Sequence, residues 1–141
     1  MHRPIALIIL AAIFDAPAAA GELVVRIENV ANAAGEVGCA LYRSDAGFPM
    51  DSTVAEQQWQ RAVSGGVVCR FTGLPAGRYA IAVSHDLDGD RRTDTNLVGI
   101  PTEAWGVSNN VRPMFRAPRF EEAAVAVPGD ATATISVRLD L

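Results

Sequence analysis

The stretch LPAGRYAIAVSHDLDGD, residues 74–90, combines a turn, a strand and an acidic loop in one run. Residues 75–77, PAG, are typical of a tight turn. The residues that follow alternate in character, and Tyr79, Ile81 and Val83 fall on one face. This period of two indicates a strand that is buried on one side.

Similar alternation lies on both sides of this stretch. It predicts further strands over residues 23–28, 35–43, 63–71, 123–127 and 133–141, and the last of these should point Ile135, Val137, Leu139 and Leu141 inward. Several short strands with Gly/Pro turns between them predict an all-β protein, an antiparallel β-sandwich of the immunoglobulin-like or transthyretin-like type.

Residues 51–62, DSTVAEQQWQRA, differ from the rest of the chain. They are rich in helix formers, and Thr53 with Glu56 fits a capping box. We therefore expect one short helix or helical turn here between two strands, with Trp59 covering an edge or a face of a sheet.

The N-terminus resembles a targeting signal. Basic residues at 2–3 precede an apolar run over 5–14, and small residues follow up to Ala20. The run is too short to span a bilayer. We expect residues 1–20 to be a signal peptide, residues 21–141 to form a single β-sandwich domain, and the protein to be periplasmic or secreted.

Composition narrows the range of partners. The net charge is −4, and the chain has no Lys and no basic block, so nucleic-acid binding is not expected. No second apolar segment approaches membrane length, so membrane insertion is not expected either.

The two cysteines, Cys39 and Cys69, predict a disulfide, as is usual for an even pair in an exported chain. Alternation in each strand places both sulfurs on the face that is turned to the core. Such a bond should stabilise the fold by about 3–4 kcal/mol. A redox-active pair would need a Cys-x-x-Cys spacing, which is absent.

The acidic loop has carboxylates at positions 1, 3, 5 and 9 of one run: Asp86, Asp88, Asp90 and Asp94. Calcium favours such loops because it takes six to eight oxygen ligands. The loop is not an EF-hand, since Arg91 and Leu97 stand where Gly and Glu are required. The pattern fits a weak calcium site, and calcium is the only cofactor that it indicates.

A plain turn fits the same residues. Gly89 permits a tight backbone, the aspartates can form Asx-turns, and Arg91 and Arg92 can neutralise the acids without a cation. Zinc is disfavoured because only one His follows the signal and the thiols are expected to be oxidised.

No catalytic residue is predicted. Ser84, His85 and Asp86 are consecutive on a strand, so their side chains alternate between faces and cannot form a relay. A hydrolase that uses Asp88, Asp94 or Glu103 is an alternative, but acids on a solvated loop lack the burial that tunes a general acid.

Residues 96–120 form a long segment without clear periodicity, and such loops are often functional. One reading is an Ω-like loop that closes one end of the sandwich. The other is a binding face, for an unidentified protein or carbohydrate, made by Glu103, Trp105, Ser108, Asn109 and Asn110.

Residues 74–110 and the later APRFEEAAVAV resemble the bacterial family of exported proteins known as domain of unknown function 2141. The matching motifs are Leu-Pro-x-Gly-x-Tyr-Ala from Leu74, His-Asp-x-Asp-x-Asp from His85, Gly-Ile-Pro-x-Glu from Gly99, Gly-x-Ser-Asn-Asn from Gly106 and Pro-x-Phe from Pro118. Val107 replaces the usual aromatic residue, and Arg91 stands where Gly is common. The resemblance implies the fold and export but no activity.

The strand and acidic loop are also similar to transthyretin-like and carboxypeptidase-regulatory-like modules, an analogy of fold alone. We expect an exported, non-enzymatic binding or accessory module that acts through the acidic loop and residues 96–120. The alternatives are a calcium-dependent module for carbohydrate or protein, and a hydrolase that uses loop carboxylates.

Overall fold

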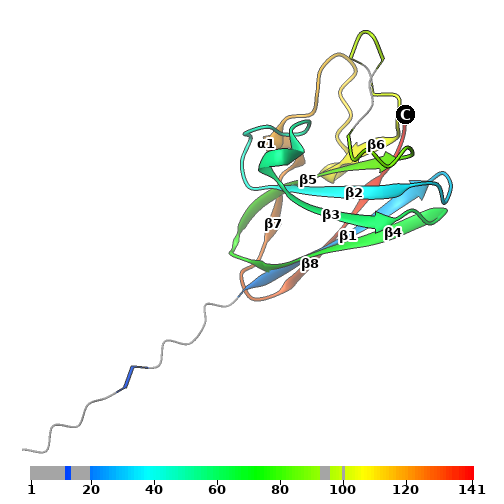
Figure 1. The fold of residues 1–141 in the computed structure, drawn as a ribbon. Helices are drawn as coiled ribbons and strands as arrows, with labels where there is room; N and C mark the ends of the chain where they lie inside the picture. The colour runs from blue at the N-terminus through cyan, green and yellow to red at the C-terminus, as the bar shows by residue number, and fades with distance from the viewer. Residues whose placement is uncertain (1–11, 14–19, 93–95, 100) are drawn as a thin grey trace, which may run out of the picture.

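The computed structural model describes residues 12–13, 20–92, 96–99 and 101–141, and it contains a sandwich of two sheets (Figure 1). One sheet has the strand order β4-β1-β8; the other has the order β3-β2-β5-β6, with β7 paired to β5. The strands are β1 (Gly21–Val30), β2 (Glu36–Tyr42), β3 (Glu56–Arg61), β4 (Gly65–Leu74), β5 (Gly77–Asp86), β6 (Trp105–Val107), β7 (Val125–Val127) and β8 (Thr132–Arg138). The predicted all-β sandwich is confirmed.

The core lies between the two sheets, where alternate residues of each strand point inward. Leu23, Val25 and Ile27 of β1 are buried, and Leu41 of β2 and Ile81 of β5 pack from the other sheet. β1 pairs with β4 in antiparallel fashion but with β8 in parallel. The sandwich is therefore mostly antiparallel, as predicted, apart from the parallel pairing of β1 with β8.

The predicted disulfide is confirmed. Cys39 of β2 and Cys69 of β4 are both buried and bonded, and their Cα atoms are 6.7 Å apart. Since β2 and β4 belong to different sheets, the bond links the two layers of the sandwich.

Of the short helix or helical turn predicted over residues 51–62, only a turn is present. A single 3-10 turn, η1 (Ser52–Val54), is followed by the edge strand β3. Asp51, and not Thr53, caps the turn by accepting a hydrogen bond from the backbone N–H of Thr53. Pairing of β3 with β2 outweighs the helix propensity of the segment.

Two further expectations near the C-terminus need correction. Ala123 ends a short helix, α1 (Phe120–Ala123), instead of beginning a strand. Val137 and Leu139 are buried and Ile135 is packed against the core, but Leu141 is 82% exposed because β8 ends at Arg138.

The predicted signal peptide falls almost entirely on residues 1–11 and 14–19, outside the described residues, and remains a prediction. In the part of the chain that the structure describes, no helix has the length and apolar character needed to cross a membrane.

Candidate functional site

The outer face of the five-stranded sheet is made of small residues at its centre. Alternation along β2 and β5 turns Gly38, Ala40, Ala82 and Ser84 away from the core. At one end of this face, Tyr42, Phe48 and Phe120 stack edge to face, with ring centroids 5.2 and 6.1 Å apart, and cover the sheet. Beyond these three rings, the small residues of the sheet leave room above the strands.

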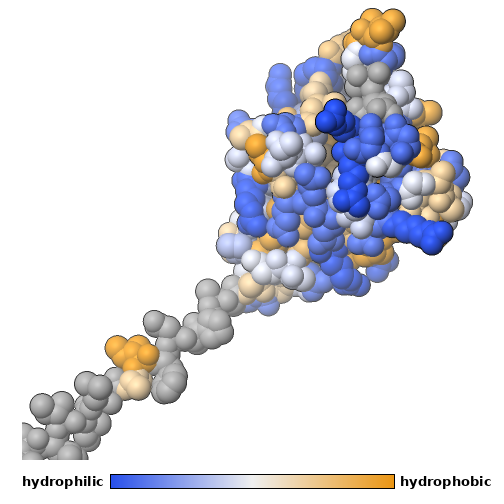
Figure 2. Space-filling model, in the orientation of Figure 1, coloured by the Kyte–Doolittle hydropathy of each residue, from blue (hydrophilic) through white to orange (hydrophobic). Residues whose placement is uncertain are grey.

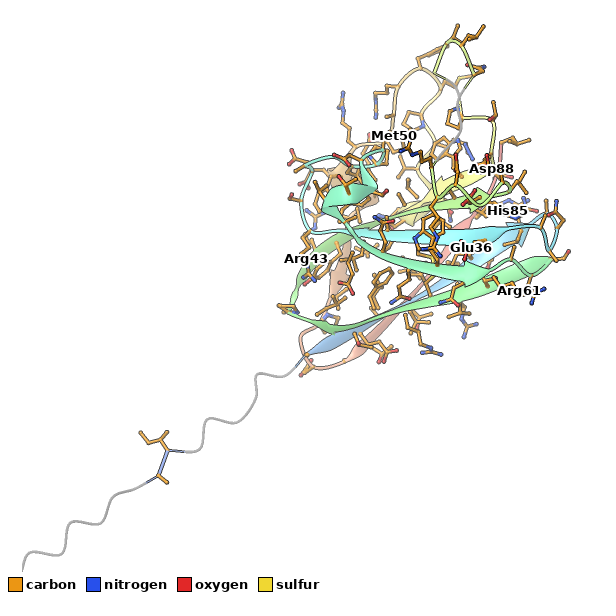
Figure 3. All side chains as sticks on the ribbon, in the orientation of Figure 1. Glu36, Arg43, Met50, Arg61, His85 and Asp88 are labelled. Carbon is orange, nitrogen blue, oxygen red and sulfur yellow. A yellow bond between two sulfur atoms is a disulfide. The ribbon has the colours of Figure 1, made fainter. Side chains whose placement is uncertain are left out.

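A cleft of about 910 Å³ occupies this room. Trp59 and Trp105 line the cleft from strands at opposite edges of the sheet, β3 and β6. Met50 and residues 113–118 complete its walls. Met50 and Asp88 both lie above β2 in Figure 3. In Figure 2 apolar residues gather at the top of the molecule, on the side of the loops that border the cleft. Described residues of the segment 96–120 therefore form one wall of the cleft.

Trp59 lies flat across the sheet because its cross-strand partner is Gly38. A Cβ atom on Gly38 would lie only 2.5 Å from the indole ring. The guanidinium of Arg91 is 5.0 Å from the ring centroid on Trp59 and forms an ion pair with Glu36, with an Nε to Oε2 distance of 3.0 Å. These contacts fix one wall of the cleft.

Trp105 forms the opposite wall. It is half-buried and lies opposite Ser84, where β6 pairs with β5. The Arg112 guanidinium lies 4.0 Å from its ring centroid and donates hydrogen bonds of 2.7 Å to the carbonyls of Trp105 and Asp140. Trp105, which the sequence predicted as a binding residue, therefore lines the cleft.

Ser108, Asn109 and Asn110 form the turn η2 (Ser108–Asn110) and hydrogen-bond to backbone groups. The Ser108 hydroxyl accepts a bond from the Ile81 N–H at 2.9 Å and donates one to the Ala123 carbonyl at 2.5 Å. The Asn109 amide donates to the carbonyls of Glu122 and Ala124 at the end of α1, and Asn110 accepts from the Arg138 N–H at 2.8 Å. These bonds hold the loop on the sandwich, and a ligand-binding role for the three side chains stays a prediction.

The acidic loop begins with a buried residue. Asp86 is 1% exposed, and its two carboxylate oxygens accept hydrogen bonds from the N–H groups of Gly89 and Arg91 at 2.9 and 2.7 Å. His85 lies on the other side of the strand, where its Nε2 is 2.6 Å from the Ala34 carbonyl, so it anchors a loop. Figure 3 labels His85 and Asp88 at the end of β5.

Glu103 joins this loop from the segment before β6. It is 4% exposed, and its Oε1 accepts a hydrogen bond from the Leu87 N–H at 3.0 Å. One carboxylate oxygen from each of Asp86, Asp88 and Glu103 lies within 4.8 Å of the other two. Our expectation that the loop acids are all solvated is therefore wrong.

The cluster differs from the set predicted from spacing. Asp90 is not part of it, and its carboxylate accepts a hydrogen bond from the Arg92 N–H at 2.8 Å. Asp94 lies outside the described residues. Glu103 was predicted as a ligand-binding residue, and nothing in the loop spacing could show that the chain returns to place it beside Asp86.

The pKa values of Tyr42 and Glu122, near the cleft, depart from their ordinary range. Burial, with a smaller contribution from Asp51, raises the pKa of Tyr42 to about 12. Hydrogen bonds from Arg116 and from the Arg119 backbone lower the pKa of Glu122 from 4.5 to about 2. The lowered pKa of Glu122 reflects its ion pair with Arg116, which holds this residue of the cleft wall against α1.

Comparison with known proteins places the chain in a family. No curated protein matches the chain, and no solved structure does. A family model described as an uncharacterized protein conserved in bacteria, DUF2141, matches residues 25–136, nearly the whole sandwich. On that match, and as the motifs from Leu74 to Phe120 indicated, the chain belongs to this uncharacterised bacterial family.

Proposed function

We propose that the protein is an exported, non-enzymatic binding domain that holds an amphipathic small molecule in the cleft on its outer sheet face. The observation that carries this proposal is the cleft itself, about 910 Å³ of space over small residues between Trp59 and Trp105. Small-molecule sites are typically concave, mostly apolar and of about 300–1,000 Å³.

The charges along the cleft favour a ligand with an anionic end. Arg91, Arg92 and Arg116 all line it. Arg91 is paired with Glu36 and Arg116 with Glu122, whereas no carboxylate among the described residues is within ion-pair distance of Arg92. A carboxylate or sulfonate on the ligand would pair with Arg92 while its apolar body lies between the indole rings.

The same geometry argues against catalysis. Asp86 and Glu103, the buried acids, are not among the residues that line the cleft. The acids that do line it, Asp51 and Asp90, accept hydrogen bonds from backbone N–H groups of their own turns. Ser84 lines the cleft without a base, since the neighbouring His85 contacts the Ala34 carbonyl. A binding role needs none of these groups to react.

Export is supported by two features. The disulfide between Cys39 and Cys69 is of a kind that persists in oxidising compartments. The N-terminal 20 residues have the composition of a secretory signal. Both features support a periplasmic or secreted location.

The test uses the full chain secreted into the periplasm of a bacterial host and purified from there. The probe is 8-anilinonaphthalene-1-sulfonate, an aromatic anion, and dodecanoate is the competitor. We expect saturable dye binding that dodecanoate displaces, together with a change in tryptophan emission, because both tryptophans of the chain line the cleft.

Matched variants locate the binding. Ala82→Leu fills the floor and should abolish dye binding, and Arg92→Gln should weaken it about tenfold or more through the lost charged contact. Arg26→Gln, an exposed arginine on the other sheet, is the control and should leave binding unchanged. Unchanged binding in folded Ala82→Leu would refute the proposal. Displacement of the dye by a neutral oligosaccharide but not by dodecanoate would also refute it, in favour of a carbohydrate module.

A further inference from the structure

Three carboxylates meet where the acidic loop returns to the sandwich. Asp86 ends β5, Asp88 follows in the loop, and Glu103 precedes β6. Asp86 and Glu103 are buried, Asp88 is exposed, and one oxygen of each lies within 4.8 Å of the other two. Negative charges this close repel one another unless something compensates them.

Glu103 shows that the compensation is incomplete. Its Oε1 accepts the Leu87 N–H, but its Oε2 is buried without a hydrogen-bond partner. Among the described residues, this oxygen is the only buried side-chain nitrogen or oxygen atom without a hydrogen-bond partner. Buried polar atoms are nearly always paired, so an unpaired carboxylate oxygen beside two other carboxylates points to a bound group.

The arginines of the loop compensate this charge only in part, through an attraction between Arg91 and Asp86 that falls short of an ion pair. The sequence led us to expect that Arg91 and Arg92 could neutralise the acids. The Arg91 guanidinium instead pairs with Glu36 and stacks on Trp59. Within the described part of the chain, no ion pair reaches Asp86, Asp88 or Glu103.

We infer that Asp86, Asp88 and Glu103 form a calcium site that ties the acidic loop to the segment before β6. The donors are all carboxylate oxygens, which suit a hard cation, and calcium accepts them at about 2.3–2.6 Å. Two oxygens on opposite sides of one calcium ion are thus about 4.6–5.2 Å apart, so the present spacing is compatible with a single ion. Water and backbone carbonyls complete the coordination. The inference is independent of the cleft and its ligand.

The test is thermal unfolding of the full, secreted chain after treatment with a chelator, with and without 10 mM calcium chloride. If the Kd is about 1 mM, as in many extracellular modules, the melting temperature should rise by about 4–8 °C. Isothermal titration with calcium should show one site. Equal concentrations of magnesium chloride and matched sodium chloride should give smaller shifts.

Three variants decide the matter. Glu103→Gln and Asp88→Asn should each abolish the calcium shift, and Asp90→Asn, an acid of the same loop outside the cluster, should keep it. Asp88 is exposed, so Asp88→Asn keeps the test informative if Glu103→Gln does not fold. No shift in the unmutated chain, an equal shift with magnesium or sodium, or loss of the shift in Asp90→Asn would each overturn the site. The dye experiment above has separate variants, so the two proposals fail separately.

Discussion

The two faces of the β2–β5 sheet differ although they come from the same strands. The inner face carries large apolar residues such as Leu41 and Ile81, which pack without exposure against the other sheet. The outer face has Gly38, Ala40 and Ala82, and a cleft lies above them. Because residues alternate between faces, one strand sequence can fill a core on one side and leave space for a ligand on the other. Stability and binding should therefore respond to different substitutions.

The largest effect should come from the core that the inner face packs against. Phe71→Ala removes a fully buried ring of β4, in the opposite sheet, and should lower the free energy of unfolding by about 3–5 kcal/mol. Urea denaturation followed by circular dichroism measures this loss. Below the transition, dye binding in the cleft should remain as in the unmutated chain, and weaker binding by the folded fraction would show that the two faces are coupled.

Ser108→Ala should have the next largest effect. It removes a hydroxyl that bonds the Ile81 N–H and the Ala123 carbonyl, so both backbone groups lose a buried partner. We expect a loss of about 1–3 kcal/mol by the same denaturation assay. Asn109→Gly, which removes exposed bonds from the same turn and tolerates its left-handed backbone at φ 60°, is the comparison. A larger loss in Asn109→Gly would contradict the importance of the buried bonds.

Gly38→Val acts on the outer face. The new side chain occupies the place of the Trp59 ring and should cost about 1–2 kcal/mol of stability through crowding. The more telling result is a shift in tryptophan emission together with weaker dye binding, because the ring must leave the sheet. Unchanged emission would mean that Trp59 does not depend on Gly38 for its position.

The smallest effect concerns the wall of the cleft and depends on pH. The pKa of Glu122 is lowered from 4.5 to about 2 in the folded protein, so its ion pair with Arg116 contributes fully to stability at pH values above about 4.5. That contribution is lost as the pH falls through about 2. The melting temperatures of the parent and Glu122→Gln should differ near neutral pH and converge towards pH 2. Glu28→Gln on β1 controls for the loss of one charge, and a difference that persists at the lowest pH would refute the assignment.

The sequence predicted those features that rest on local periodicity. Alternation located β1, β2, β4 and β5, and the position of Cys39 and Cys69 in that alternation predicted the disulfide. It failed for residues 56–61, where pairing with β2 turns a helix-forming sequence into a strand. An edge partner of this kind is not encoded within the segment.

The candidate site was predicted only in part for the same reason. Asp86 and Asp88 were identified because their spacing is local. The place of Glu103 beside them, the pairing of Arg91 with Glu36, and the contact of Trp59 with Gly38 all join residues far apart in the chain. Such contacts depend on the register of whole strands, which a single sequence does not specify.

The position of the disulfide has a consequence for the way the cleft can work. Cys39 stands between Gly38 and Ala40, so the strand that forms the floor is covalently attached, from beneath, to β4 of the opposite sheet. A floor held in this way cannot slide or bend towards a ligand. The ligand proposed above would then meet a surface that is already ordered, and little conformational entropy would be lost on binding.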